Sequence, residues 1–393
     1  GGYSYYMEAV PGLISSAQGA GYEATVVEEY LADHPVPADD LVHVEDGAWV
    51  NADGDFGSPI MLNWNWPLVN ASGQIDIPNG WAEDERNWAV ITAAQNRVDT
   101  AEQIAGGTRI EKILYPDDTT TAAERAWHYY LASLNSGYMY YGTSLDMEVK
   151  PTVACNEAVE HADSVIGDGA ADTTPPTIWA PQRHPWNPGS TNFGPQYGYQ
   201  QYNSNGDFWV WTFVHDVSDV ASVTLKYRVD ADGENPLSSI QNETYAGGSE
   251  VGAWQELAMT RRIFPKGNFL NDPTIDFFEL PTYIADEYYV QVTGLRSMLI
   301  DYYVEAVDGK GNTRKSPIQH VYIGDGSGTT GGDAVTVAPN PPVAGQSVKI
   351  TYNPAGRPLA GASQICLHYG FNRWNPVVSP DPAMSWNAMG GCW

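Results

Sequence analysis

The sequence contains little cysteine, little positive charge and no long apolar run. Only three of its 393 residues are cysteines. Cys366 and Cys392 lie in one small C-terminal segment and could form a disulfide in an oxidising environment, which would leave Cys155 as a buried, inert thiol. No stretch is long and apolar enough to cross a membrane as a helix, so we expect no membrane partner.

Positive charge is scarce, because 19 lysines and arginines stand against 48 aspartates and glutamates, giving a formal net charge of −29. A surface of this sign repels phosphate backbones, so nucleic acid is not an expected partner. It suits a soluble, secreted protein that handles neutral ligands. Aromatic residues make up 12% of the chain, and their rings can either stack on sugars or fill the cores of β-sandwiches.

Neither end of the sequence resembles a natural terminus. The chain has no initiator methionine and no visible signal peptide, so we expect it to be a mature or trimmed part of a longer product. Its length predicts two or three domains.

One short stretch organises the N-terminal part. Leu41–Val44 is apolar and sharply bounded, as a buried parallel strand would be, and it ends in Glu45 and Asp46. Acids at the C-terminal end of a buried strand lie where α/β barrels keep their chemistry. Gly47 allows an immediate turn, so that Asp46 would project into the mouth of the sheet beside Trp49. The alternative is that both acids simply begin a polar loop.

Four segments have helical periodicity, at residues 24–32, 83–105, 121–134 and 151–165. The second is followed by a Gly-Gly C-cap signal, and the third begins with a Thr-x-x-Glu capping box. A helix followed by the Leu41 strand makes one α/β unit. We therefore expect residues 1–170 to be the C-terminal part of an incomplete α/β barrel with a helical segment.

Two aromatic segments could contact a sugar. Trp64 lies between Asn63 and Asn65, and the segment 135–142 reads Asn-Ser-Gly-Tyr-Met-Tyr-Tyr-Gly. Indole and phenol rings beside amides can form a hydrogen-bonding sugar subsite, although ordinary packing is the alternative for any one of them. The expected substrate-binding residues of this part are Trp49, Trp64, Asn135, Tyr140 and Tyr141.

The strand that ends in Asp46-Gly47 resembles the fourth motif of glycoside hydrolase family 57 and the related family 119, which act on α-glucans. The segment 135–142 resembles the fifth motif of family 57, which lines the substrate cleft. The resemblance implies that Asp46 is the general acid/base. Ser136 stands where many members have an aspartate, which leaves the details of substrate binding open, and Asp146 and Glu148 could compensate.

The resemblance also implies a retaining mechanism, which needs two carboxylates about 5–5.5 Å apart. Asp46 and the adjacent Glu45 are the candidate catalytic carboxylates in this chain. The nucleophilic glutamate of the two families lies on an earlier strand, and no glutamate here matches it convincingly. We therefore expect the nucleophile in sequence upstream of Gly1.

After Asp172-Thr-Thr-Pro-Pro the pattern changes to period-two alternation with turn signals between strands. The expected strands are 207–213, 222–229, 287–292, 299–307 and 320–323. Residues 171–324 are accordingly predicted to be a fibronectin- or immunoglobulin-like β-sandwich.

Within this module, Asp230, Asp232 and Glu234 cluster oxygen donors around a glycine turn. The cluster suggests a weak structural calcium site, and a plain hairpin turn is the alternative. No cofactor is otherwise expected. Asn70 and Asn242 head glycosylation sequons, which are meaningful only in a eukaryotic secretory source.

Residues 325–333 are a flexible Gly/Ser/Thr linker, and residues 334–393 follow as a second sandwich. The spacing of His368, Gly370 and Trp374 resembles the signature of carbohydrate-binding module family 25, which binds starch. The resemblance implies that His368 and Trp374 contact glucose units with help from Asn372, in a module that is cut short.

The sequence therefore predicts a multidomain chain, in which an incomplete α/β barrel precedes two β-sandwich modules. The expected function is a secreted glycoside hydrolase whose partner is an α-glucan such as starch. The alternatives are a non-catalytic extracellular carbohydrate-binding or assembly protein, and an enzyme of another polysaccharide, since the residues alone do not fix the linkage.

Overall fold

The computed structural model describes most of the chain. The described residues are 2–23, 25–35, 49–51, 60–62, 68–135, 138, 145–192, 202–230, 233, 240–271, 275, 277–326, 335–338, 346–354, 362–367, 380–386 and 393. The chain divides into two compact units, residues 1–47 with 236–239 and all remaining residues. Each unit is described by itself.

The first unit contains two helices, α1 (Gly2–Gly19) and α2 (Val27–Asp33). The periodicity of residues 24–32 predicted α2. Helix α1 was not predicted, because Pro11 and Gly12 both disfavour the interior of a helix. Large apolar side chains of both helices are exposed, among them Leu13 and Val27.

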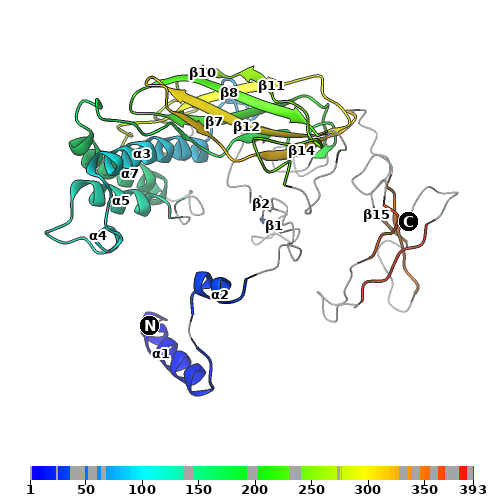
Figure 1. Cartoon of the computed structure of the whole chain (residues 1–393), viewed down its shortest axis with the longest axis horizontal. Coiled ribbons are helices and arrows are strands. Elements are labelled where there is room, and N and C mark those ends of the chain that lie inside the picture. The colour runs from blue at the N-terminus through cyan, green and yellow to red at the C-terminus, as the bar shows by residue number, and fades with distance from the viewer. Residues whose placement is uncertain are drawn as a thin grey trace. The chain divides into compact units, whose positions relative to one another are not determined.

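The second unit begins with a short antiparallel hairpin and a group of helices. Strand β1 (Trp49–Asn51) pairs with β2 (Ile60–Leu62). The helices are α3 (Glu83–Ala105), α4 (Ile110–Leu114), α5 (Ala122–Ser133) and α7 (Leu145–Ile166). Helices α3, α5 and α7 pack around a common core that includes Val98, Tyr130 and Val159 (Figure 1).

The ends of these helices follow the signals in the sequence. Thr121 accepts a hydrogen bond from the Glu124 backbone while the Glu124 side chain accepts one from the Thr121 backbone, so the capping box is confirmed. Gly106 ends α3 in the left-handed region at φ 78°, where glycine has no steric cost. Helix α7 begins at Leu145, earlier than predicted, with Pro151 inside it.

Two five-stranded antiparallel sheets follow the helices. The first has the order β10–β11–β7–β3 with β4 also paired to β7, and its strands are β3 (Thr177–Ile178), β4 (Gln182–His184), β7 (Phe208–His215), β10 (Thr260–Arg262) and β11 (Asp286–Val292). The second has the order β13–β12–β8–β9 with β14 also paired to β12, and its strands are β8 (Val220–Val229), β9 (Gln255–Ala258), β12 (Met298–Asp308), β13 (Thr313–Lys315) and β14 (Gln319–Ile323).

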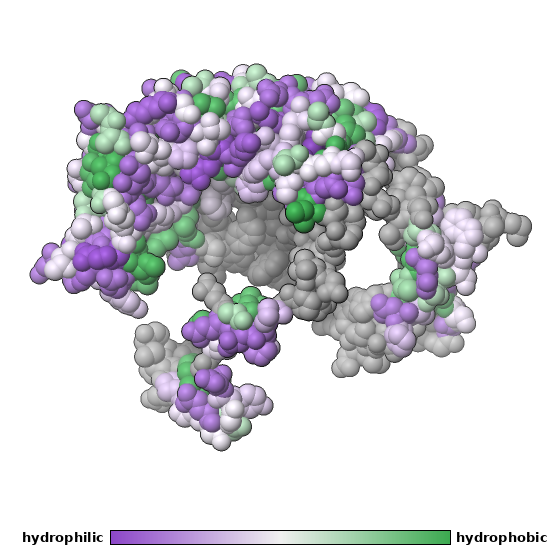
Figure 2. All heavy atoms as spheres, viewed as in Figure 1, coloured by the Kyte–Doolittle hydropathy of each residue, from purple (hydrophilic) through white to green (hydrophobic). Residues whose placement is uncertain are grey.

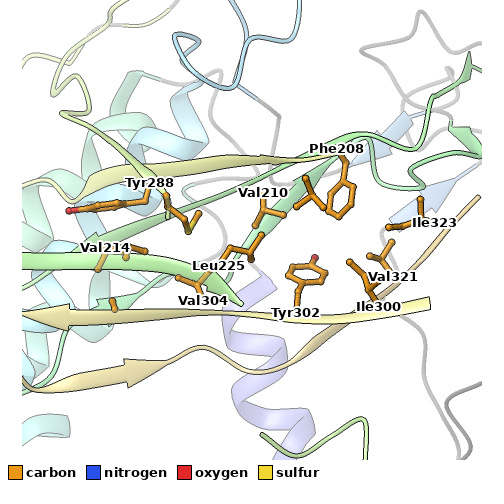
Figure 3. Packing of buried hydrophobic residues seen from close by; sticks show 14 residues of the cluster. Phe208, Val210, Val214, Leu225, Tyr288, Ile300, Tyr302, Val304, Val321 and Ile323 are labelled. Carbon is orange, nitrogen blue, oxygen red and sulfur yellow. The ribbon is translucent and has the colours of Figure 1, made fainter. Parts of the chain in front are cut away.

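The two sheets enclose one apolar core, which Figure 3 shows from close by. Phe208, Val210 and Val214 of β7 point into it, and Ile300, Tyr302 and Val304 of β12 are also among its members. The five strands predicted from period-two alternation are all present, as β7, β8, β11, β12 and β14. The alternation succeeded because the inner faces of these strands are buried.

The outer face of the first sheet is covered by helix α3. Trp211 and Phe213 of β7 point to this side, where they share a core with Ala89 and Ala93 of α3. The backbone N–H of Ala285 donates to the carbonyl of Ala89 at 3.0 Å, which fixes the start of β11 against the helix. Helix α3 and the first sheet therefore share one packed core.

Two further strand pairs are small. Strand β5 (Thr191–Asn192) pairs with β6 (Tyr202–Asn203), and β15 (Val335–Ala338) pairs with β16 (Lys349–Tyr352). Every strand pairing in the described part of the chain is antiparallel. The predicted strand Leu41–Val44 lies outside the described residues, so the barrel stays a prediction, as do the domain boundaries.

The surface over the sheets is mainly hydrophilic, with isolated apolar residues between (Figure 2). None of the helices in the described part of the chain has the length and apolar character that a membrane span requires.

Replacing Phe213 tests the shared packing of helix and sheet. Phe213 is fully buried, and its ring centroid lies 4.9 Å from that of Phe264 and 5.4 Å from that of Trp179. We expect Phe213→Ala to lower the free energy of unfolding by about 3–5 kcal/mol, because it leaves a cavity between α3 and the first sheet. Urea denaturation followed by circular dichroism and by tryptophan fluorescence measures it.

The matched control is Phe278→Ala, since the Phe278 side chain is 67% exposed and its loss leaves no cavity. A loss below about 1 kcal/mol for Phe213→Ala would contradict the packing described.

Candidate functional site

The two candidate catalytic carboxylates, Glu45 and Asp46, lie outside the described residues. The same is true of Trp64, Tyr140 and Tyr141. Their roles therefore stay predictions, and the structure contributes the elements that flank them in sequence.

Trp49 lies in β1, directly opposite Leu62 of β2. The hairpin thus begins three residues after Asp46 and ends two residues before Trp64. The expected acid and the first expected aromatic subsite are consequently connected to one short antiparallel hairpin.

The second aromatic segment connects two packed helices. Asn135 is exposed and follows the end of α5, and α7 begins at Leu145. Helices α5 and α7 share the core that contains Tyr130 and Val159. Within the segment, the ring of Tyr138 lies 6.0 Å from Lys150 Nζ of α7. The segment that contains Tyr140 and Tyr141 therefore connects, in sequence, two helices that share one core.

Three further substrate-binding predictions, His368, Asn372 and Trp374, also lie outside the described residues. The chain just before them pairs with a later segment, since Leu367 N–H donates to Pro382 O at 2.9 Å and Met384 N–H donates to Ile365 O at 2.8 Å. Cys366 and Ala383, which lie between these two hydrogen bonds, form an isolated antiparallel β-bridge. The described segments that precede and follow the expected binding residues in sequence thus form an antiparallel pair.

Asp230, the first residue of the suggested calcium loop, is buried and hydrogen-bonded within the protein. Its carboxylate accepts from Gly233 N–H at 3.1 Å and from Asn242 Nδ2 at 2.6 Å. Gly233 has φ +75°, as a tight turn requires. Asp232 and Glu234 lie outside the described residues, so calcium and the plain turn both stay open.

Asp230 belongs to a larger buried network. Asn242 Nδ2 also donates to Asp301 Oδ1 at 3.1 Å, and Arg228 Nε donates to Asp301 Oδ2 at 2.8 Å. His320 Nδ1 lies 2.8 Å from Asp301 Oδ1. Burial alone would raise the pKa of Asp301, but hydrogen bonds from His320, Arg228 and Asn242 outweigh it and hold that pKa below its usual value.

This network also includes the asparagine of one glycosylation sequon. Asn242 is fully buried with its amide between two carboxylates, so the sequon it heads is inaccessible to glycosylation in the folded protein. The signal that could have indicated the network is the pair Arg228 and Asp301, two charged residues directly opposite each other on β8 and β12.

A second acidic group was not predicted at all. Among the residues the structure describes, Asp172, Asp216 and Asp308 form the group that could hold a metal ion, with one oxygen of each within 4.8 Å of the others. All three are buried. Three carboxylates would suit a hard cation such as calcium or magnesium. The three residues lie far apart in sequence, so no local motif indicates them.

Protein donors already hold these carboxylates in place. Asp172 Oδ1 accepts from Thr174 N–H at 2.8 Å, and Asp216 Oδ1 accepts from Ser218 N–H at 2.7 Å. Asp308 accepts from two backbone amides in the turn that follows β12. Burial, with repulsion from the other two aspartates, raises the pKa of Asp216 to about 7. The group thus also has a structural role in joining three loops.

Comparison with known proteins gives one informative match. No family model matches the chain. The chain is similar to an α-amylase. It is 27% identical, over 382 aligned residues, to a protein from Niallia circulans named alpha-amylase, and the alignment covers 78% of this chain. The chain spans only 30% of the length of that relative. The similarity does not by itself assign catalytic residues.

Replacing Asp301 tests the buried network. We expect Asp301→Asn to lower the free energy of unfolding by about 3–5 kcal/mol, because it removes the partner of Arg228 and leaves a buried guanidinium without its carboxylate. Chemical denaturation at constant pH measures the change.

The control is Asp117→Asn, which removes the exposed partner of Lys112 and should move the denaturation midpoint far less. Equal shifts in the two variants would contradict the role given to the buried pair.

Proposed function

We propose that this chain is part of a secreted glycoside hydrolase that cleaves α-glucans with retention of configuration. The observation that carries the proposal is the similarity to a protein named alpha-amylase over 78% of the chain. Asp46 would be the general acid/base. The nucleophilic glutamate of this proposal would come from sequence upstream of residue 1.

In this mechanism Asp46 first protonates the glycosidic oxygen while the nucleophile attacks the anomeric carbon. Asp46 then removes a proton from the water that hydrolyses the glycosyl-enzyme intermediate. Glu45 is the neighbouring carboxylate and the second candidate for a catalytic role. The strongly negative chain favours a neutral substrate, since a net charge of −29 would repel an anionic polymer.

The aromatic residues would provide the substrate cleft. Trp49, Trp64, Tyr140 and Tyr141 present rings on which sugar C–H faces can stack, and Asn135 can hydrogen-bond to hydroxyl groups. The shared core of α5 and α7, the helices that flank the segment 135–145 in sequence, supports this role, because a cleft wall needs packed elements beside it.

His368, Asn372 and Trp374 would form a separate starch-binding surface in residues 334–393. A tethered binding module raises the effective concentration of the catalytic site at the polymer, and this gain is independent of catalysis.

A non-catalytic carbohydrate-binding protein is the second candidate. Two observations favour it, namely Ser136 in the place of an aspartate that many similar enzymes have and the lack of a matching nucleophile within these residues. The two candidates differ in one outcome, which is whether the protein of full natural length releases sugar from starch.

Replacing Asp46 tests the catalytic assignment. In the protein of full natural length, we expect Asp46→Asn to lower kcat for soluble starch by about 10²–10⁴-fold, because the proton transfers lose their donor and acceptor. Reducing-sugar release measures turnover, and affinity electrophoresis in starch measures binding, which should persist.

The control is Asp118→Asn, which changes an exposed aspartate in the loop before α5 and should leave turnover unchanged. Wild-type turnover in Asp46→Asn would reject the assignment. No turnover in the wild-type protein would favour the non-catalytic candidate.

Replacing Trp374 tests the binding module. We expect Trp374→Ala to weaken retention on granular starch about tenfold, since a stacked ring contributes about 0.5–1.5 kcal/mol in addition to the apolar area that it buries. Hydrolysis of short soluble maltooligosaccharides should be unaffected. Trp386→Ala is the matched control, because Trp386 is an exposed tryptophan of the same module. Equal retention of both variants would argue against the assignment.

A further inference from the structure

The contact between helix α3 and the first sheet contains two buried glutamates. Glu85 lies in the first turn of α3, Glu287 lies in β11, and neither side chain is exposed. Buried carboxylates are rare unless a cation or several hydrogen bonds compensate for the lost hydration. This pair therefore needs a physical explanation.

Each glutamate has one oxygen with a partner and one without. Glu85 Oε2 accepts from Trp211 Nε1 at 3.1 Å, and Glu287 Oε2 accepts from Arg262 Nη1 at 2.8 Å. In the described part of the chain, Glu85 Oε1 and Glu287 Oε1 are both buried and have no hydrogen-bond partner. Two unpaired carboxylate oxygens in one apolar contact would be strongly destabilising if both groups were ionised.

The strand register places Glu287 on the same face of the sheet as Trp211, the hydrogen-bond partner of Glu85. Phe213 of β7 lies opposite Glu287 of β11, and Trp211 lies opposite Tyr289. Trp211 and Glu287 are therefore on the same face of the sheet, at diagonal positions. Because Glu85 is bonded to the Trp211 indole, its carboxyl group lies over the same part of the sheet as that of Glu287.

The neighbouring charges decide which glutamate is neutral. Glu287 has a cation, since Arg262 pairs with it and also donates to Gly80 O at 2.7 Å and Asn79 O at 3.0 Å. Within the described part of the chain, the Glu85 carboxyl group accepts a hydrogen bond only from the neutral indole of Trp211. Glu85 is therefore the group that keeps a proton.

The other charged groups around the contact do not neutralise the Glu85 carboxyl group in place of that proton. Asp84 of α3 repels Glu85, and Asp76 in the segment before α3 repels Glu287. Arg86 donates instead to Lys266 O, Asn87 Oδ1 and Thr152 Oγ1. The charge of Glu83 attracts the Arg86 guanidinium.

We propose that Glu85 and Glu287 share one proton in the folded protein, with Glu85 Oε1–H donating to Glu287 Oε1, so that the contact between the helical layer and the sandwich is a proton-dependent clamp. Both unpaired oxygens then gain a partner. No bond other than the hydrogen bond forms, and loss of the proton to solvent leaves two carboxylates beside one guanidinium.

The electrostatics agree with this arrangement. Burial, with repulsion from Glu287 and Asp84, raises the pKa of Glu85 well above its usual value of 4.5. Burial also raises the pKa of Glu287 to about 8 despite Arg262. Since the unfolded chain releases the shared proton near pH 4.5, its stabilising contribution is complete below that pH and is lost as the pH rises through about 8.

The test is pH-dependent denaturation of the 393-residue protein and of Glu85→Gln. A glutamine amide can donate to Glu287 and accept from Trp211 without ionising. We expect the folding equilibrium constant of the wild-type protein to fall at least about tenfold between pH 5.5 and 8.5, and that of Glu85→Gln to fall clearly less. Glu111→Gln, at an exposed position of α4, should have the wild-type slope.

The same slope in Glu85→Gln and wild type would overturn the proposal. If Glu85→Gln does not fold, the carboxyl ¹³C resonances of the wild-type protein decide. A glutamate that is still protonated at pH 7 supports the shared proton, with Glu287→Gln used to separate the two signals. Titration of every glutamate below pH 6 overturns it. Neither readout depends on hydrolytic activity, so the proposed function can fail without affecting this result.

Discussion

The burial of strand β7 on both faces is the constraint on which the second unit depends. One face of β7 completes the core between the two sheets, and the other face packs Trp211 and Phe213 against α3. A one-residue shift in the register of such a strand would exchange its two sets of side chains and disrupt the packing on both faces at once. The position of α3, and through it of α5 and α7, is therefore fixed by the same residues that hold the sandwich together.

Much of this could be predicted from the sequence, because local signals and packing agree. The capping box at Thr121 and the glycine after Ala105 gave the limits of two helices, and period-two alternation gave the long strands. Helix α1 was missed because Pro11-Gly12 is a strong local signal against a helix. The short strands β3, β4, β9 and β10 have too few residues for alternation to be recognised.

The buried polar groups could not be predicted, because each joins residues that are distant in sequence. Asp301 forms hydrogen bonds with Arg228, Asn242 and His320, which come from three different segments. Glu85 forms a hydrogen bond with Trp211 only when α3 packs on the first sheet. Charged residues in a strand or helix read as solvent-facing in a single sequence. Only the tertiary packing shows that these are enclosed. The candidate catalytic residues themselves still rest on motif resemblance.

Two observations support the proposed function. The chain is similar to an α-amylase, and the two helices that flank a predicted substrate-binding segment in sequence share one core. The proposed function is hydrolysis of an α-glucan with retention, and the anomeric form of the first product reports this directly. Proton NMR of maltooligosaccharide hydrolysis by the protein of full natural length, recorded before mutarotation, should show the α-anomer first. Initial release of the β-anomer would contradict the account.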